Sequence, residues 1–159
     1  MDYTTYINIL KDTLKKKTQL IDKLLEETLN QELALSQKEV DIDAFEEGVE
    51  RKGYFIQQLA QLDDGFELIY ERFGMEIKKN KLQYQGDILE LQNYIKEVLD
   101  KSTLLQGKEK NNKEKFERYL AEKKVEVRKF KINNQAVGNY YRNMSDVYQG
   151  ESIFLDKKK

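Results

Sequence analysis

The fold of this chain is set by its first long stretch, residues 2–38, which reads DYTTYINILKDTLKKKTQLIDKLLEETLNQELALSQK. Apolar side chains recur in it at spacings of three and four residues, so they line one face of a helix. They are Tyr3, Ile7, Leu10, Leu14, Ile21, Leu24 and Leu35. Lys17, Thr28 and Gln31 interrupt this stripe, and additional leucines beside it widen the apolar face. We therefore predict a first helix over residues 1–38 that packs on more than one neighbour.

A second helix is expected after a turn near residues 39–42. Asp43 and Glu46 form a pattern in which an acidic N-cap and a carboxylate three residues later satisfy free backbone amides. Apolar residues then recur at spacings of three, four or seven as far as Phe73, which predicts a helix over residues 42–76. Gly65 lies inside this range, and we expect the helix to continue through it.

The third helical segment begins after a polar and basic connection between Gly74 and Gly86. Asp87 and Glu90 give a third start signal, and the apolar pattern that follows predicts a helix over residues 87–137. Its seven-residue phase passes through a polar stretch from Gly107 to residue 115 without a slip. This helix is expected to be one rod or a rod bent near residue 107, followed by a C-terminal amphipathic segment over residues 138–159.

Composition supports a single helical domain. The chain has 159 residues, of which 36% are charged and 39% hydrophobic, and it contains no proline to interrupt long helices. We predict an all-α fold: an elongated antiparallel helical hairpin or bundle of three to four long helices with coiled-coil character.

The same composition excludes several chemistries. Without cysteine or histidine there are no disulfides, no Cys/His zinc sites and no histidine acid–base catalysis. Paired carboxylates such as Glu46 and Glu50 are still able to bind a cation or transfer a proton. The alternative interpretation is that they form solvated acidic surface. We expect no enzyme, catalytic residue, cofactor or metal site. No apolar run reaches the roughly 20 residues that span a bilayer, so we expect a cytoplasmic protein without membrane insertion.

Charge is unevenly distributed along the chain. Residues 1–80 carry 11 basic and 17 acidic side chains and residues 81–159 carry 17 and 12, so the halves differ in sign, at −6 and +5. We expect these halves to face each other in the folded chain. Nucleic acid is not an expected partner of the basic stretch at residues 108–131, because Glu109 and Lys113, four residues apart, are typical of a solvated helix surface.

The end of the chain is rich in aromatic and aliphatic side chains. They are Tyr140, Tyr141, Met144, Val147, Tyr148, Ile153, Phe154 and Leu155. Tyrosine and methionine offer large, adaptable apolar surface to a partner helix, whereas aromatic stripes at helical spacing also close bundle cores. The pattern alone leaves both interpretations open: a partner-binding site or part of the core.

A set of features follows one order along nearly the whole chain. They are Leu24, Leu25, Glu32 and Leu35, then an acidic turn at Asp41 and Asp43, then Phe45, Val49, Lys52, Ile56 and Leu59, then Leu62 to Glu67 with Arg72, and finally Asn111 and Asn112. In this order the chain resembles flagellar export chaperones of the FlgN family. The late segment Tyr148-Gln149-Gly150 matches only loosely a Tyr-Gly element often seen in that family.

The resemblance implies a cytosolic protein that binds hook-associated flagellar proteins as export cargo and keeps them unpolymerised, with contacts to the export apparatus. It also implies that the C-terminal segment, Tyr140 to Leu155, is the cargo-binding part. The alternative is a structural coiled-coil adaptor or homodimeric scaffold with no chaperone role, and self-association into a homodimer is open in either case.

Overall fold

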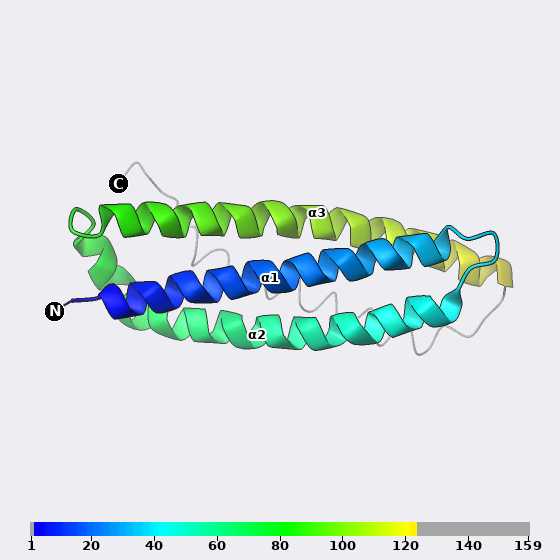
Figure 1. The fold of residues 1–159 in the computed structure, drawn as a ribbon, viewed down its shortest axis with the longest axis horizontal. Helices are drawn as coiled ribbons and strands as arrows, with labels where there is room; N and C mark the ends of the chain where they lie inside the picture. Colours follow the sequence, from blue (N-terminus) through cyan, green and yellow to red (C-terminus); the bar gives the residue numbers. More distant parts are fainter. Residues whose placement is uncertain (1, 124–159) are drawn as a thin grey trace.

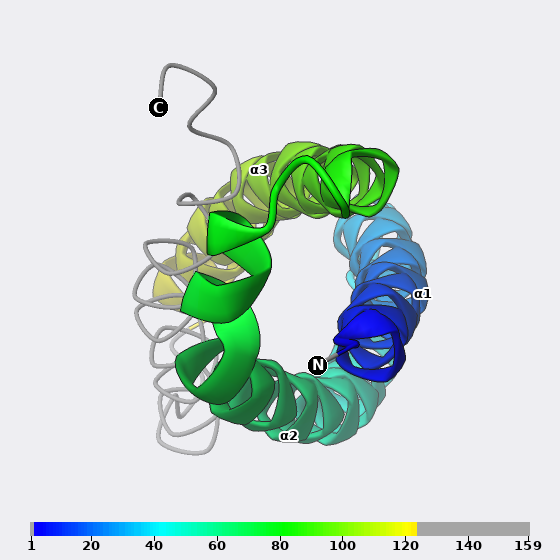
Figure 2. The same cartoon turned by 90° about the vertical axis from the view of Figure 1, so that its left-hand side faces the viewer.

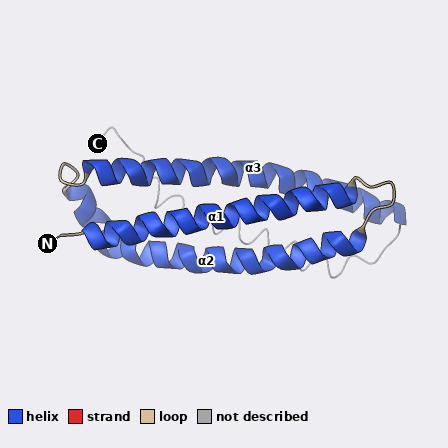
Figure 3. Ribbon diagram, viewed as in Figure 1, coloured by secondary structure: helices blue, strands red, loops and turns tan. Residues whose placement is uncertain are grey.

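The computed structural model describes residues 2–123, which form three long helices and no strand (Figure 3). Helix α1 spans Thr4–Leu35, α2 spans Ile42–Lys79 and α3 spans Gln85–Lys123. The helices lie side by side along one long axis, so the described part of the molecule is an elongated bundle (Figure 1). The predicted all-α fold is confirmed.

Helix α1 is the central element of this bundle. It packs closely against both α2 and α3 along its length, as the end-on view makes visible (Figure 2). Consecutive helices run antiparallel, so α1 and α3 point in the same direction. Lys11 of α1 contacts Asp87 near the start of α3, and Thr28 contacts Glu109 further along both helices.

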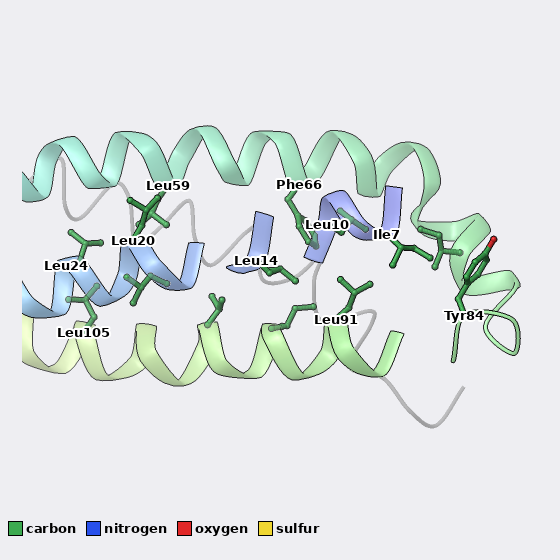
Figure 4. Packing of buried hydrophobic residues seen from close by; sticks show 14 residues of the cluster. Ile7, Leu10, Leu14, Leu20, Leu24, Leu59, Phe66, Tyr84, Leu91 and Leu105 are labelled. Carbon is green, nitrogen blue, oxygen red and sulfur yellow. The ribbon is translucent and has the colours of Figure 1, made fainter. Parts of the chain in front are cut away.

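The core follows the seven-residue repeat that the sequence predicts for α1. Nine of its buried positions alternate at spacings of three and four without a break, which is the geometry of coiled-coil packing. They are Ile7, Leu10, Leu14, Lys17, Ile21, Leu24, Thr28, Gln31 and Leu35. Most of the apolar ones join a cluster with side chains from the other two helices, among them Leu59, Phe66, Leu91 and Leu105 (Figure 4).

A second, smaller apolar cluster closes the end of the bundle that holds the α1–α2 turn. It contains Leu35, Phe45, Phe116 and Leu120. The Phe45 and Phe116 rings stack with centroids 4.5 Å apart and an interplanar angle of 6°. Gly48 allows a close approach beside this cluster, because a Cβ there would lie 2.9 Å from Gln31 Cγ.

The helix boundaries differ from the predicted ones by two or three residues. Helix α1 ends at Leu35 and not at residue 38, whereas α2 continues to Lys79, past the predicted end at residue 76. Helix α2 passes through Gly65 without interruption, and α3 begins at Gln85 and passes through Gly107 as one helix. The rest of the predicted third helix, residues 124–137, and the segment 138–159 lie outside the described residues.

The N-cap of α2 is Asp41, so the prediction that Asp43 caps this helix is wrong. The Asp41 carboxylate accepts a hydrogen bond from the Ala44 backbone N–H at 3.1 Å, and Asp43 lies within the first turn. Asp41, and not Asp43, reaches a free amide, and the helix begins at Ile42. Asp43 is still favourably placed, since an acidic side chain in the first turn complements the helix dipole.

This assignment predicts different costs for two neighbouring substitutions. Replacing Asp41 with alanine removes the capping bond and should lower the free energy of unfolding by about 1 kcal/mol. Asp43→Ala should cost less, because it removes only a charge near the helix N-terminus. Urea unfolding followed by far-UV circular dichroism measures both, and a larger loss for Asp43→Ala would contradict the assignment.

Candidate functional site

The most distinctive chemical feature of the described chain is a set of polar side chains buried inside the bundle. The buried members are Lys17, Thr28, Gln31, Lys52, Asp63, Gln92, Ser102 and Asn112. Burying charged or polar groups costs free energy unless they are paired. Several of these side chains pair across helices, in two groups.

The first group is an ion pair between Lys17 of α1 and Asp63 of α2. Lys17 Nζ lies 2.7 Å from Asp63 Oδ1, and the two side chains are only 1% and 8% exposed. Burial raises the pKa of the Asp63 carboxyl, and the Lys17 ammonium opposes this shift without cancelling it. The pair therefore joins α1 and α2 at one height of the bundle.

The second group, here called the Lys52 network, consists of Thr28, Gln31, Lys52, Glu109 and Asn112. Lys52 of α2 donates to Gln31 Oε1 of α1 at 2.7 Å and forms an ion pair with Glu109 of α3. Burial lowers the pKa of Lys52, and the nearby Glu109 carboxylate opposes that shift. One ammonium group thus connects all three helices.

The remaining members of the Lys52 network tie side chains to backbone groups. Gln31 Nε2 donates to the Phe45 carbonyl oxygen at 3.0 Å, and Asn112 Nδ2 donates to the Thr28 carbonyl oxygen at 2.9 Å. The Thr28 hydroxyl lies 3.1 Å from the Glu109 carboxylate and 2.7 Å from the Leu24 carbonyl oxygen. Such contacts tolerate only one alignment of the helices, so the network fixes their register.

The expectation that Glu109 lies on a solvated helix surface is wrong. Its side chain is only 17% exposed and points to Lys52, because residue 109 continues the buried seven-residue phase of Ile95, Ser102 and Phe116. The sequence analysis identified this phase, but it did not predict that polar residues within the phase are buried. The sequence analysis placed none of Lys52, Asp63, Glu109 and Asn112 in the interior.

Partly exposed ion pairs also join the helices. Asp22 of α1 lies 2.8 Å from Lys101 of α3, an ion pair with the polarity expected from the charges of the two halves. Lys11 and Asp87 pair with the opposite polarity at 2.6 Å. These partly exposed pairs add less stability than the buried ones, because solvent screens them.

No candidate metal site emerges within residues 2–123. That part of the chain has no group of three or more acidic side chains arranged to hold a metal ion. Glu46 is half-buried and Glu50 exposed near the start of α2. All eight predicted partner-binding residues, Tyr140 to Leu155, lie outside the described residues.

Comparison with known proteins adds no relative. No family model matches the chain, and neither a curated protein nor a solved structure matches it. Among the described helices, none combines the length and apolar character needed to cross a membrane.

The Lys52 network predicts a non-additive pair of substitutions. Lys52→Met should lower the free energy of unfolding by about 3 kcal/mol, since it leaves Glu109 and Gln31 without their cation inside the bundle. The double variant Lys52→Met/Glu109→Leu should regain most of this loss, because both charges are then replaced by apolar groups. Urea unfolding of the two variants and of Glu109→Leu measures the coupling, and additive effects would contradict it.

The raised pKa of Asp63 predicts a pH dependence with a definite sign. The folded chain binds a proton at Asp63 at a higher pH than the unfolded chain does, so acidification through the folded pKa favours the folded state. The stability of the native chain relative to Asp63→Asn should therefore rise as the pH falls from neutral. Urea-unfolding free energies across this range test it, with Glu71→Gln, at an exposed position of the same helix, as the control. A relative stability that falls on acidification would show that Lys17 governs the titration of Asp63.

Proposed function

We propose that this protein is a cytoplasmic chaperone that binds hook-associated proteins and keeps them unpolymerised for flagellar type III export. In this proposal α1, α2 and α3 form the scaffold. The segment from Tyr140 to Leu155 contacts the cargo. Components of the export apparatus are further partners.

The observation that carries the proposal is the way apolar residues are divided along the chain. Residues from Ile7 to Leu120 supply an apolar core that all three described helices share. An aromatic-rich segment then follows α3 in the sequence. A scaffold of fixed register with an apolar segment attached to it suits a protein that covers the apolar surface of another.

The proposed mechanism is the covering of an aggregation-prone cargo helix. Tyr140, Tyr141 and Met144 offer broad apolar area with few conformational restrictions, and an amphipathic cargo helix can lie against it. In this proposal, masking an aggregation-prone helix of the cargo prevents polymerisation until export.

The family resemblance contributes to this proposal unevenly. Lys52, Asp63 and Asn112, three of the residues on which it rests, are buried in the bundle. They are related to how the helices align and not to cargo contact. The cargo assignment therefore depends on the C-terminal segment alone.

Affinity capture from a lysate of the source cell tests the proposal. The full chain should recover a hook-associated or filament-type subunit, identified by mass spectrometry. The triple variant Tyr140→Ala/Tyr141→Ala/Met144→Ala should recover at least about tenfold less of it, the loss expected when apolar contact residues are truncated. The matched control is Leu89→Ala/Leu104→Ala, which truncates exposed apolar side chains of α3 and should leave recovery unchanged.

Circular dichroism of the triple variant separates binding from folding. Retained helicity with lost cargo supports the proposal, whereas unfolding would place the aromatic segment in the core. Equal recovery by the full chain and the triple variant would contradict the cargo site. If neither the full chain nor either variant recovers a flagellar subunit, the homodimeric scaffold is favoured.

A further inference from the structure

Helices α2 and α3 both pack against α1 but not against each other. No Cα atom of α2 lies within 8 Å of a Cα atom of α3, whereas both helices come that close to α1 along their length. The end-on view shows α2 and α3 on either side of α1 (Figure 2). Side chains that cross the centre of the bundle join them, as in the stack of Phe45 on Phe116. The three described helices thus leave the long side of the bundle between α2 and α3 without a helix.

The side of α3 that turns away from α1 is nevertheless covered. Tyr94 marks the side that faces α1, since the Lys15 ammonium lies 5.5 Å from the centroid of its ring. Gln92 comes two residues earlier and therefore lies on the opposite side of the helix, and Leu99 follows one heptad after Gln92. Gln92 is only 8% exposed and Leu99 is half-buried. Because glutamine on a free helix side is normally exposed, this burial requires a cover that α1 does not supply.

The same relation holds on α2. Arg51 marks the side that faces α1, because it pairs with Glu27 at 2.8 Å. Val49 comes two residues earlier, on the opposite side, and Ile56 follows one heptad later. Both side chains are half-buried. The surface that these sides of α2 and α3 form together is here called the α2–α3 face, and its residues are Val49, Ile56, Tyr70, Ile88, Gln92 and Leu99.

We propose that residues 124–159 of the same chain cover the α2–α3 face as a fourth helix. Helix α3 ends at Lys123, one turn past Leu120, which packs with Phe45 near the start of α2. The 36 residues that follow in the sequence therefore start at the end of the face that holds Val49. In helical form they span about 54 Å, close to the length of α2, so they can run back along the whole face.

The apolar pattern of residues 124–159 matches this position. Five apolar side chains follow one another at spacings of seven, four, three and four residues, so a helix carries them on one face. They are Phe130, Val137, Tyr141, Met144 and Tyr148. The charged residues Arg128, Arg142 and Asp146 fall on the other side of the same helix. An amphipathic helix of this kind needs an apolar surface to cover, and the α2–α3 face provides one.

This docking goes beyond the proposed function and does not depend on it. Tyr140, Val147 and Phe154 form a second row at seven-residue spacing, beside the five apolar residues of the docking row. All three belong to the proposed cargo-binding residues. A docked segment therefore still offers an apolar row to cargo.

A cysteine-protection experiment on the full chain tests the proposal. The chain has no cysteine of its own, so an introduced thiol is the only reporter. Met144→Cys places the thiol on the proposed docking row, and Asp146→Cys, two residues later, places it on the opposite side. Relative to its own rate in urea, Met144→Cys should react with a thiol reagent at least about tenfold more slowly than Asp146→Cys, because a covered thiol reacts only when the helix undocks. This protection should not change with protein concentration, since docking occurs within one chain.

Substitutions in the α2–α3 face should remove the protection. Ile56→Asp and Leu99→Asp should each raise the relative rate of Met144→Cys at least about tenfold, because each places an unpaired charge under the docked helix. Leu104→Asp, at an exposed leucine on another side of α3, is the matched control and should leave the rate unchanged. Circular dichroism checks that the variants stay helical. The milder pair Ile56→Ala/Leu99→Ala adds no charge and should change the rate in the same direction.

Three results would overturn the proposal. The first is an equal relative rate for the two cysteine reporters in the otherwise native chain. The second is protection of Met144→Cys that no substitution at Ile56 or Leu99 reduces. The third is protection that rises with protein concentration, which would place the segment on a second copy. The thiol rates are measured without cargo, so the docking proposal and the cargo proposal can each fail alone.

Discussion

The alignment of the three helices depends on the buried cation of Lys52. Lys52 lies between the other two helices, with Gln31 of α1 on one side and Glu109 of α3 on the other. An ammonium group inside a bundle is costly unless its partners are held in place, so the three helices are constrained to the one alignment that brings these groups together. Sliding one helix by a single turn would bury the charge without a partner.

A second charge pair makes the alignment more specific. Lys17 and Asp63 link α1 to α2 about 14 positions along α1 from the Lys52 network, with apolar side chains in the positions between them. Apolar heptads alone accept several registers with similar energy, because one leucine layer resembles the next. Polar layers at two heights of the bundle distinguish the native register from registers in which one helix is shifted. The charged interior therefore selects the register, which the apolar core alone does not do.

The proposed function places cargo contact on a part of the chain that is separate from the scaffold. A bundle of fixed register is compatible with cargo contact through the segment that follows α3 in the sequence. That segment is dense in aromatic side chains. Dense aromatic surfaces favour the covering of another apolar surface.

The sequence by itself determined that the chain is all-α, that it forms long uninterrupted helices, and which apolar positions of α1 face inward. These properties are local: periodicity, the lack of proline and the acidic start signals act within each segment. Only the tertiary structure decided that Lys17, Thr28 and Gln31 continue the buried stripe, where the pattern had shown interruptions, and that Glu109 lies inside. A polar side chain is predicted to face solvent as long as its partner is unknown. The partners here come from helices far away in the sequence and are Asp63, Lys52 and Asn112. The N-cap of α2 is Asp41 and not the predicted Asp43 for a similar reason, because capping depends on which carboxylate reaches an amide in three dimensions.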